Sequence, residues 1–241
     1  MKNFLIFISV VLLLYGLVNF YIFIRGWQAI PKGSVLRFYY IGIFLVLSLS
    51  YVIGRWVEKY SISTFSDILI WTGSFWLGIM LYSFLGLLLF DLLRGINNLT
   101  GFFPDFITRD WAKTKVISAT VLISAVIITI IAGRINALTP RVFPMDIRID
   151  KKAGVQKTLN IAAASDIHLG TIIRNGRLTY LVDKMNSMNP DIILFAGDIV
   201  DEDLGPVIKQ NLGATLLKLK AKYGVYAVTG NHEFFWRCSG G

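Results

Sequence analysis

Long apolar runs dominate the first half of the chain. Four of them reach the length of a membrane span, at about residues 4–24, 38–53, 68–90 and 116–132. An apolar helix needs roughly 20 residues to cross the hydrocarbon core of a bilayer. The middles of these runs carry no Lys, Arg, Asp or Glu, and aromatic residues gather near their ends, as interfacial anchoring favours. The pattern predicts a four-span transmembrane region over residues 1–140, with Asp91 and Arg94 just past the third span.

The pattern changes after Pro140 to that of a water-facing α/β domain, residues 141–241. Alternating apolar and polar positions predict a strand at 145–149. Further strands are expected at 159–164, 192–196 and 225–229, and the helices between them at 178–188 and 207–222. A β-α-β-α-β order implies a parallel sheet with helical crossovers. The predicted fold is therefore a four-helix transmembrane region followed by an α/β domain.

Composition and charge agree with a membrane-bound protein. Apolar residues make up 55% of the 241 residues and charged residues 16%, against roughly 25% charged in ordinary globular proteins. The net charge is +9, and +7 of it falls in residues 1–145. A basic excess in the membrane half favours contact with anionic lipid head groups. A nucleic-acid partner is not expected, because the water-facing half shows no basic stripe.

Residues with metal-binding chemistry follow the three later strands. Asp166, His168, Asp198, Asn231 and His232 all lie just beyond predicted strand ends, at the rim where open α/β sheets bind ligands. Neighbouring strands lie about 4.8 Å apart, so three such turns can aim side chains at one small volume. Each motif alone is equally well explained as a helix cap or turn. Their order and placement together predict a metal site whose carboxylate, imidazole and amide donors suit Mn, Fe or Zn.

The three motifs resemble a known family. SDIH at 165–168, GDIVD at 197–201 and GNHE at 230–233 look like the first three motifs of the calcineurin-like metallophosphoesterase superfamily. The four-span front end is similar to the membrane-anchored bacterial members. The resemblance covers about residues 145–235 and implies a two-sheet α/β sandwich, of which this chain would hold the β-α-β-α-β half.

Site roles follow from the resemblance. It implies two divalent metal ions (Mn, Fe or Zn), with Asp166 and His168 on the first metal and Asp198 as the bridging carboxylate. Asn231 would bind the second metal through its amide oxygen. The two metals would sit about 3.5–4 Å apart, lower the pKa of a bridging water and clamp an in-line attack on phosphorus.

The resemblance also implies a catalytic histidine. His232 would contact the phosphate and protonate the leaving oxygen as a general acid, and Asp201 has the spacing of the acid that orients it. The implied function is a membrane-anchored, metal-dependent phosphoesterase that hydrolyses phosphate mono- or diesters. The membrane region suggests a lipid-linked substrate, and the bacterial inner membrane is the expected location.

One departure from the family pattern bears on activity. The pattern continues with a later His and a Gly-His-x-His, whereas this chain contains two histidines, His168 and His232. We therefore expect an incomplete piece of an enzyme, with little or no activity of its own. A non-catalytic membrane scaffold or metal-binding module is the main alternative. A transporter or channel with a regulatory domain is a further one, which the lack of charges within the spans disfavours.

Overall fold

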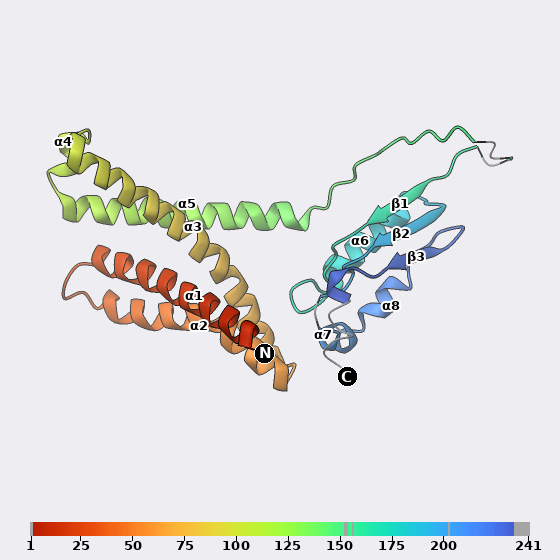
Figure 1. The fold of residues 1–241 in the computed structure, drawn as a ribbon, viewed down its shortest axis with the longest axis horizontal. Coiled ribbons are helices and arrows are strands. Elements are labelled where there is room, and N and C mark those ends of the chain that lie inside the picture. Colours follow the sequence, from red (N-terminus) through yellow and green to blue (C-terminus); the bar gives the residue numbers. More distant parts are fainter. Residues whose placement is uncertain (1, 152–153, 156, 202, 234–241) are drawn as a thin grey trace. The chain divides into compact units, whose positions relative to one another are not determined.

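The chain folds into a helical unit and an α/β unit. The computed structural model describes residues 2–151, 154–155, 157–201 and 203–233 (Figure 1). The two compact units comprise Met1–Ala137 and Leu138–Gly241. Long apolar helices followed by a small parallel sheet confirm the predicted fold class.

Four long helices and one short helix make up the first unit. They are α1 (Lys2–Ala29), α2 (Leu36–Tyr60), α3 (Thr64–Thr100), α4 (Asp105–Thr108) and α5 (Trp111–Leu138). The four long helices are each long and apolar enough to cross a membrane, which confirms four candidate spans. All four are longer than predicted. At 1.5 Å per residue the 37 residues of α3 extend about 55 Å, beyond the roughly 30 Å of a hydrocarbon core. Asp91 and Arg94 lie within this helix, which continues to Thr100, and their placement just past the third membrane span stays a prediction.

Apolar side chains close the interior of this unit. Ile22 of α1, Phe44 of α2 and Trp76 of α3 form its buried cluster. Gly73 lets α3 approach the backbone of α2 at Tyr51, because a Cβ there would overlap the main chain. The three helices therefore pack directly against one another.

Polar side chains within the helices are paired. Trp76 Nε1 donates a hydrogen bond to Asn19 Oδ1 at 2.9 Å, and both residues are buried. Asp91 of α3 forms an ion pair with Arg25 of α1 and accepts a hydrogen bond from the Tyr21 hydroxyl. Such polar contacts link helices where the surrounding lipid offers no hydrogen-bond partner.

The α/β unit is built on a three-stranded parallel sheet. Its strands are β1 (Ile161–Ala164), β2 (Ile192–Ala196) and β3 (Val225–Val228), in the order β1-β2-β3. Ile161 pairs with Ile192, and Ile193 pairs with Val225. The sheet order therefore follows the chain, and the three carboxyl ends lie at one edge, as the sequence predicted.

One face of the sheet is covered by helix α6 (Asn175–Ser187). Leu178, Val182 and Met185 are buried in one cluster with Ile193 and Phe195 of β2. The alternating burial of β2 leaves its other face partly open, and all four residues of β3 are exposed. The helix ends as predicted, because the next turn contains a left-handed residue followed by a proline, Asn189-Pro190.

The predicted helix at 207–222 is wrong. Two short helices, α7 (Gly205–Lys209) and α8 (Leu212–Leu216), replace it. Asn211 between them has a φ of 50°, a left-handed conformation that interrupts a right-handed helix. Beyond α8 the side chain of Asn186 donates to Lys218 O at 2.9 Å and accepts from Lys220 N at 2.8 Å. These bonds satisfy the backbone without a helix.

The predicted strand at 145–149 is also wrong. These residues have no regular secondary structure, although their sequence alternates. Met145, Ile147 and Ile149 are 79%, 74% and 70% exposed. A strand needs a neighbour for its backbone N–H and C=O groups, and no described residue pairs with this segment as a strand.

Candidate metal centre

Three loops meet beyond the carboxyl ends of the strands. The backbone ladder between β1 and β2 continues past both strand ends, with His168 N donating to Asp198 O at 3.0 Å. Leu169 N then donates to Ile199 O at 2.9 Å. The loop after β1 therefore runs alongside the loop after β2, and this pairing sets His168 beside Asp198.

Left-handed backbone turns distinguish these loops. Asp166, His168 and Asp198 have φ values of 54°, 51° and 51°. Asp and His are among the side chains that tolerate this region best, yet each residue there typically costs about 1–3 kcal/mol. The turns redirect side chains out of the strand alternation. Strain gathered at three polar residues is typical of a functional site.

Two glycines bring the loops after β2 and β3 into backbone contact. A Cβ on Gly230 would lie 2.6 Å from Asp198 N, and one on Gly197 would lie 2.8 Å from Gly230 Cα. Both separations are too short for any side chain, so these positions require glycine. The contact places the GNHE segment directly against Asp198.

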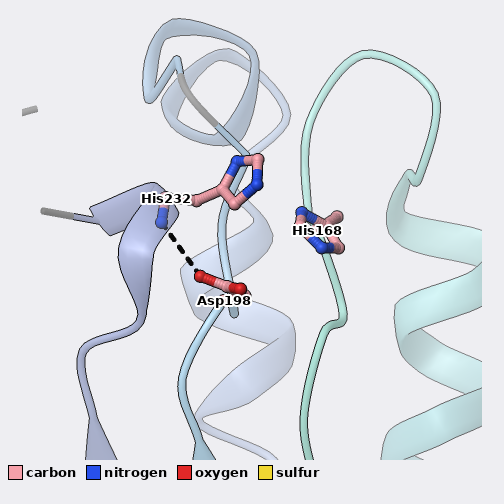
Figure 2. Close-up of side chains that lie close together, drawn as sticks. All are labelled: His168, Asp198 and His232. Atoms are coloured by element: carbon pink, nitrogen blue, oxygen red, sulfur yellow. Dashed lines mark hydrogen bonds between the residues drawn. The ribbon is translucent and has the colours of Figure 1, made fainter. Parts of the chain in front are cut away.

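Three candidate ligands converge at this point. One ligand atom from each of His168, Asp198 and His232 lies within 4.8 Å of the other two. Figure 2 shows the two imidazoles beside the carboxylate. The centroids of the two rings are 4.5 Å apart, and the ring planes meet at 85°. The backbone N–H of His232 donates to Asp198 Oδ1 at 2.9 Å. The sequence-predicted site thus brings residues from all three loops together, and two of its metal ligands, His168 and Asp198, lie in the cluster.

Asp201 lies next to both histidines. Its Oδ1 is 3.5 Å from His232 Nδ1 and 3.9 Å from His168 Nδ1. His232 Nδ1 is buried and has no hydrogen-bond partner among the residues that the structure describes. The 3.5 Å approach is within ion-pair range but does not satisfy hydrogen-bond geometry. The Asp201 carboxylate thus lies within ion-pair range of the His232 imidazole.

Asp166 and Asn231 lie at the edge of the cluster. Both are exposed, and Asp166 N donates to Gly197 O at 3.2 Å. Among the described His, Cys, Asp and Glu residues, the group close enough to share one ion contains His168, Asp198 and His232 but not Asp166. The assignments of Asp166 and Asn231 as metal ligands stay predictions.

Sequence reasoning missed Glu233, whose carboxylate ties two loops together. Its Oε1 accepts from Ile199 N at 2.6 Å and from Val200 N at 3.0 Å. Its Oε2 accepts from Asp198 N at 3.0 Å and from Gly230 N at 2.8 Å. Burial raises the pKa of the Glu233 carboxyl, but the backbone N–H groups that point at it outweigh burial and hold its pKa below the ordinary value. The one sequence signal that could have pointed to Glu233 is its position directly after His232 in the GNHE segment.

The cluster has the chemistry of a divalent-metal centre. Two imidazoles and a carboxylate are donors that Zn, Mn and Fe accept. The buried Nδ1 of His232 adds a polar atom that no hydrogen bond from a described residue satisfies. The residues present therefore fit a metal ion.

Comparison with known proteins supports this reading. Residues 159–241 match the family model described as calcineurin-like phosphoesterase. A metallophosphoesterase of Campylobacter jejuni is 30% identical over 96% of this chain and 60% of its own length. A transmembrane protein with a metallophosphoesterase domain from Danio rerio is 29% identical over 66% of this chain and 38% of its own length. No solved structure matches the chain significantly.

The chain therefore carries a domain of the calcineurin-like metallophosphoesterase family. Four apolar helices and relatives named as transmembrane proteins identify it as a membrane protein. The matched region spans 60% of the Campylobacter relative and 38% of the zebrafish relative.

Proposed function

We propose that this chain belongs to a membrane-anchored, metal-dependent enzyme that hydrolyses phosphate mono- or diesters. The observation that carries the proposal is the convergence of His168, Asp198 and His232, whose ligand atoms lie within 4.8 Å of one another. Each comes from a different loop at the carboxyl edge of the sheet. That edge is the usual ligand-binding side of an open α/β sheet.

Two divalent ions, drawn from Mn, Fe and Zn, are the proposed cofactors. Asp166 and His168 would hold the first, Asn231 the second, and Asp198 both. When bound, such ions stabilise charge on phosphoryl oxygens and lower the pKa of bound water. Asp198 Oδ1 already accepts the His232 N–H, which fixes its orientation and leaves Oδ2 for a metal.

His232 is the proposed general acid. Asp201 Oδ1 lies 3.5 Å from His232 Nδ1, so a proton on Nδ1 would face the carboxylate. That arrangement directs Nε2 to the substrate, where it would donate a proton to the leaving oxygen. General-acid catalysis of this kind contributes about 100- to 10,000-fold.

The proposed substrate is a lipid-linked phosphoester, and membrane lipids are the proposed partners. Support comes from the four candidate spans, since a chain that crosses the bilayer would keep a covalently attached domain near membrane lipids. The bacterial cytoplasmic membrane is the proposed location, in keeping with a Campylobacter relative that covers 96% of the chain.

Hydrolysis of bis-p-nitrophenyl phosphate by the protein purified from its native membrane tests the proposal. We expect activity that depends on Mn²⁺, is removed by a chelator and falls more than about 100-fold in Asp198→Asn, since even an outer partner of a metal ligand contributes about 10- to 100-fold. Asp183→Asn makes the same chemical change at an exposed position of α6 and serves as the control. Equal activity in the Asp198 variant and the wild type would contradict the proposal.

A non-catalytic metal-binding or scaffold module is the second candidate. The observation in its favour is the histidine count, since the two histidines of the chain, His168 and His232, already lie in the cluster. Metal bound at the cluster without turnover by the native-membrane protein would favour this candidate.

A further inference from the structure

Glu233 accepts four hydrogen bonds from the loops of the site. Its four hydrogen bonds all come from backbone N–H groups, and three of the donors belong to the loop after β2. The donors Asp198, Ile199 and Val200 lie more than 30 residues away in the sequence. One carboxylate therefore connects the GNHE segment to the GDIVD segment.

The four bonds use the full acceptor capacity of the carboxylate. Each oxygen takes two N–H groups, at 2.6 and 3.0 Å for Oε1 and at 3.0 and 2.8 Å for Oε2. An ionised carboxylate offers about four lone-pair sites and no donor. A glutamine of the same shape would turn an NH₂ group toward two of the four donors, so the contact selects for a carboxylate specifically.

The donors adjoin the proposed chemistry. The backbone N–H of Asp198 donates to Glu233, and Asp198 Oδ1 accepts from the N–H of His232. His232 is the residue directly before Glu233. Fixing Glu233 against the loop after β2 therefore fixes both the carboxylate and the imidazole. Charge-assisted hydrogen bonds of this kind are about twice as strong as neutral ones.

We propose that Glu233 is a positioning residue, whose carboxylate locks the loops after β2 and β3 together and so holds Asp198, the proposed metal ligand, and His232, the proposed general acid, in their places beside the metal site. This inference rests on the proposed function for its metal-binding consequence, but the locking of the loops does not depend on it. Glu233 acts through Asp198 and His232 and does not itself need to touch a metal or substrate.

The experiment compares the full chain in detergent micelles with Glu233→Gln, Glu233→Asp, His168→Ala and the control Asp183→Asn. Two quantities are measured: hydrogen exchange of peptides covering residues 197–201 and 228–233, and affinity for Mn²⁺ from the paramagnetic resonance of the free ion. In Glu233→Gln we expect exchange of the loop amides to accelerate by about tenfold or more, because partly buried N–H groups lose a charged acceptor. Mn²⁺ affinity should fall by about 10- to 100-fold.

The other variants separate the possible causes. Glu233→Asp keeps the charge on a shorter stem, so it should recover part of both losses, whereas Asp183→Asn should match the wild type. Loop exchange and Mn²⁺ affinity at wild-type values in Glu233→Gln would overturn the inference. If the wild type does not bind Mn²⁺, or His168→Ala binds it equally well, the proposed function fails. In that case the exchange data by themselves still test whether Glu233 locks the two loops. Unchanged protection of the loop amides in Glu233→Gln would overturn that role.

Discussion

The backbone N–H of His232 donates a hydrogen bond to Oδ1 of Asp198 at 2.9 Å. The bond joins the loop after β3 to the loop after β2, and it connects the proposed general acid to the proposed bridging carboxylate. Asp198 therefore has two separable properties, a negative charge and an oxygen that accepts from His232. Removing them one at a time distinguishes a metal ligand from a structural hydrogen-bond acceptor.

Substitution of Asp198 should separate metal binding from loop structure. Asp198→Asn retains an acceptor oxygen for the His232 N–H but lacks the charge, so we expect weaker Mn²⁺ binding with near-normal exchange of the loop amides. Asp198→Leu lacks both the charge and the acceptor oxygen, so we expect it to lose both Mn²⁺ binding and protection of the loop amides. The His232 N–H is partly buried, and a donor left without an acceptor costs up to about 1–3 kcal/mol when it is fully buried. Hydrogen exchange combined with Mn²⁺ titration checks the difference. Equal effects of the two substitutions would contradict this division.

Gly230→Ala should destabilise the site locally. The new Cβ would lie 2.6 Å from Asp198 N. The loop after β2 cannot easily move away, because Asp198 N donates to Glu233 and Asp198 O accepts from His168 N. Forcing extra volume into a packed position typically costs about 1–3 kcal/mol. Hydrogen exchange of β2 and β3 amides in the full chain measures the loss, separately from the helical unit.

Gly176→Ala is the matched control for that substitution. Gly176 lies in α6, and a Cβ there would have no atom of the described residues within 4 Å. Alanine also favours the helix over glycine by up to about 1 kcal/mol. We expect exchange protection to be unchanged or slightly higher, and losses of similar size at both positions would refute the packing argument.

Asn19→Leu should weaken the helical unit. The substitution leaves Trp76 Nε1 without its acceptor inside a cluster where both residues are buried. Hydrogen bonds between membrane helices contribute roughly 0.6 kcal/mol on average and up to about 1.7 kcal/mol. Unfolding by dodecyl sulfate in mixed micelles should show a loss of that size, whereas Asn98→Leu, an exposed position of α3, should show none.

The 241-residue chain by itself should hydrolyse bis-p-nitrophenyl phosphate slowly or not at all. Its two histidines both lie in the cluster with Asp198, which leaves none for the further ligands that the family resemblance implies. Turnover of the purified chain with Mn²⁺, compared with a His232→Asn variant, checks this expectation. Rapid turnover that His232→Asn abolishes would show that the residues present suffice.

Local patterns were sufficient to predict much of the fold. The strand at 192–196 was predicted at its observed bounds, and the Asn189-Pro190 stop was placed correctly. Failures occurred where a remote contact decides the backbone. Asn186 holds the segment after α8 in a non-helical path, and the alternating segment at 145–149 has no strand beside it in the described part of the chain.

The candidate site shows the same division. Residue types and strand ends were sufficient to place Asp198, His168 and His232 at one edge of the sheet, because parallel strands share that edge. Glu233 could not be found in this way, since its partners are backbone N–H groups on a loop 33 to 35 residues earlier. Every residue but proline carries such a group, so the sequence does not mark which of them face a carboxylate.

Cobalt substitution tests the central claim most directly, that a metal ion binds at the cluster of His168, Asp198 and His232, with His168 and Asp198 among its ligands. The full chain in detergent micelles is titrated with Co²⁺ and followed by visible absorption, which responds to the ligands and geometry of the bound ion. The account predicts d–d bands that saturate with added Co²⁺, are reduced in His168→Ala and Asp198→Asn, and persist in Asp183→Asn. Absence of the bands in the wild type, or bands of equal strength in all four proteins, would contradict it.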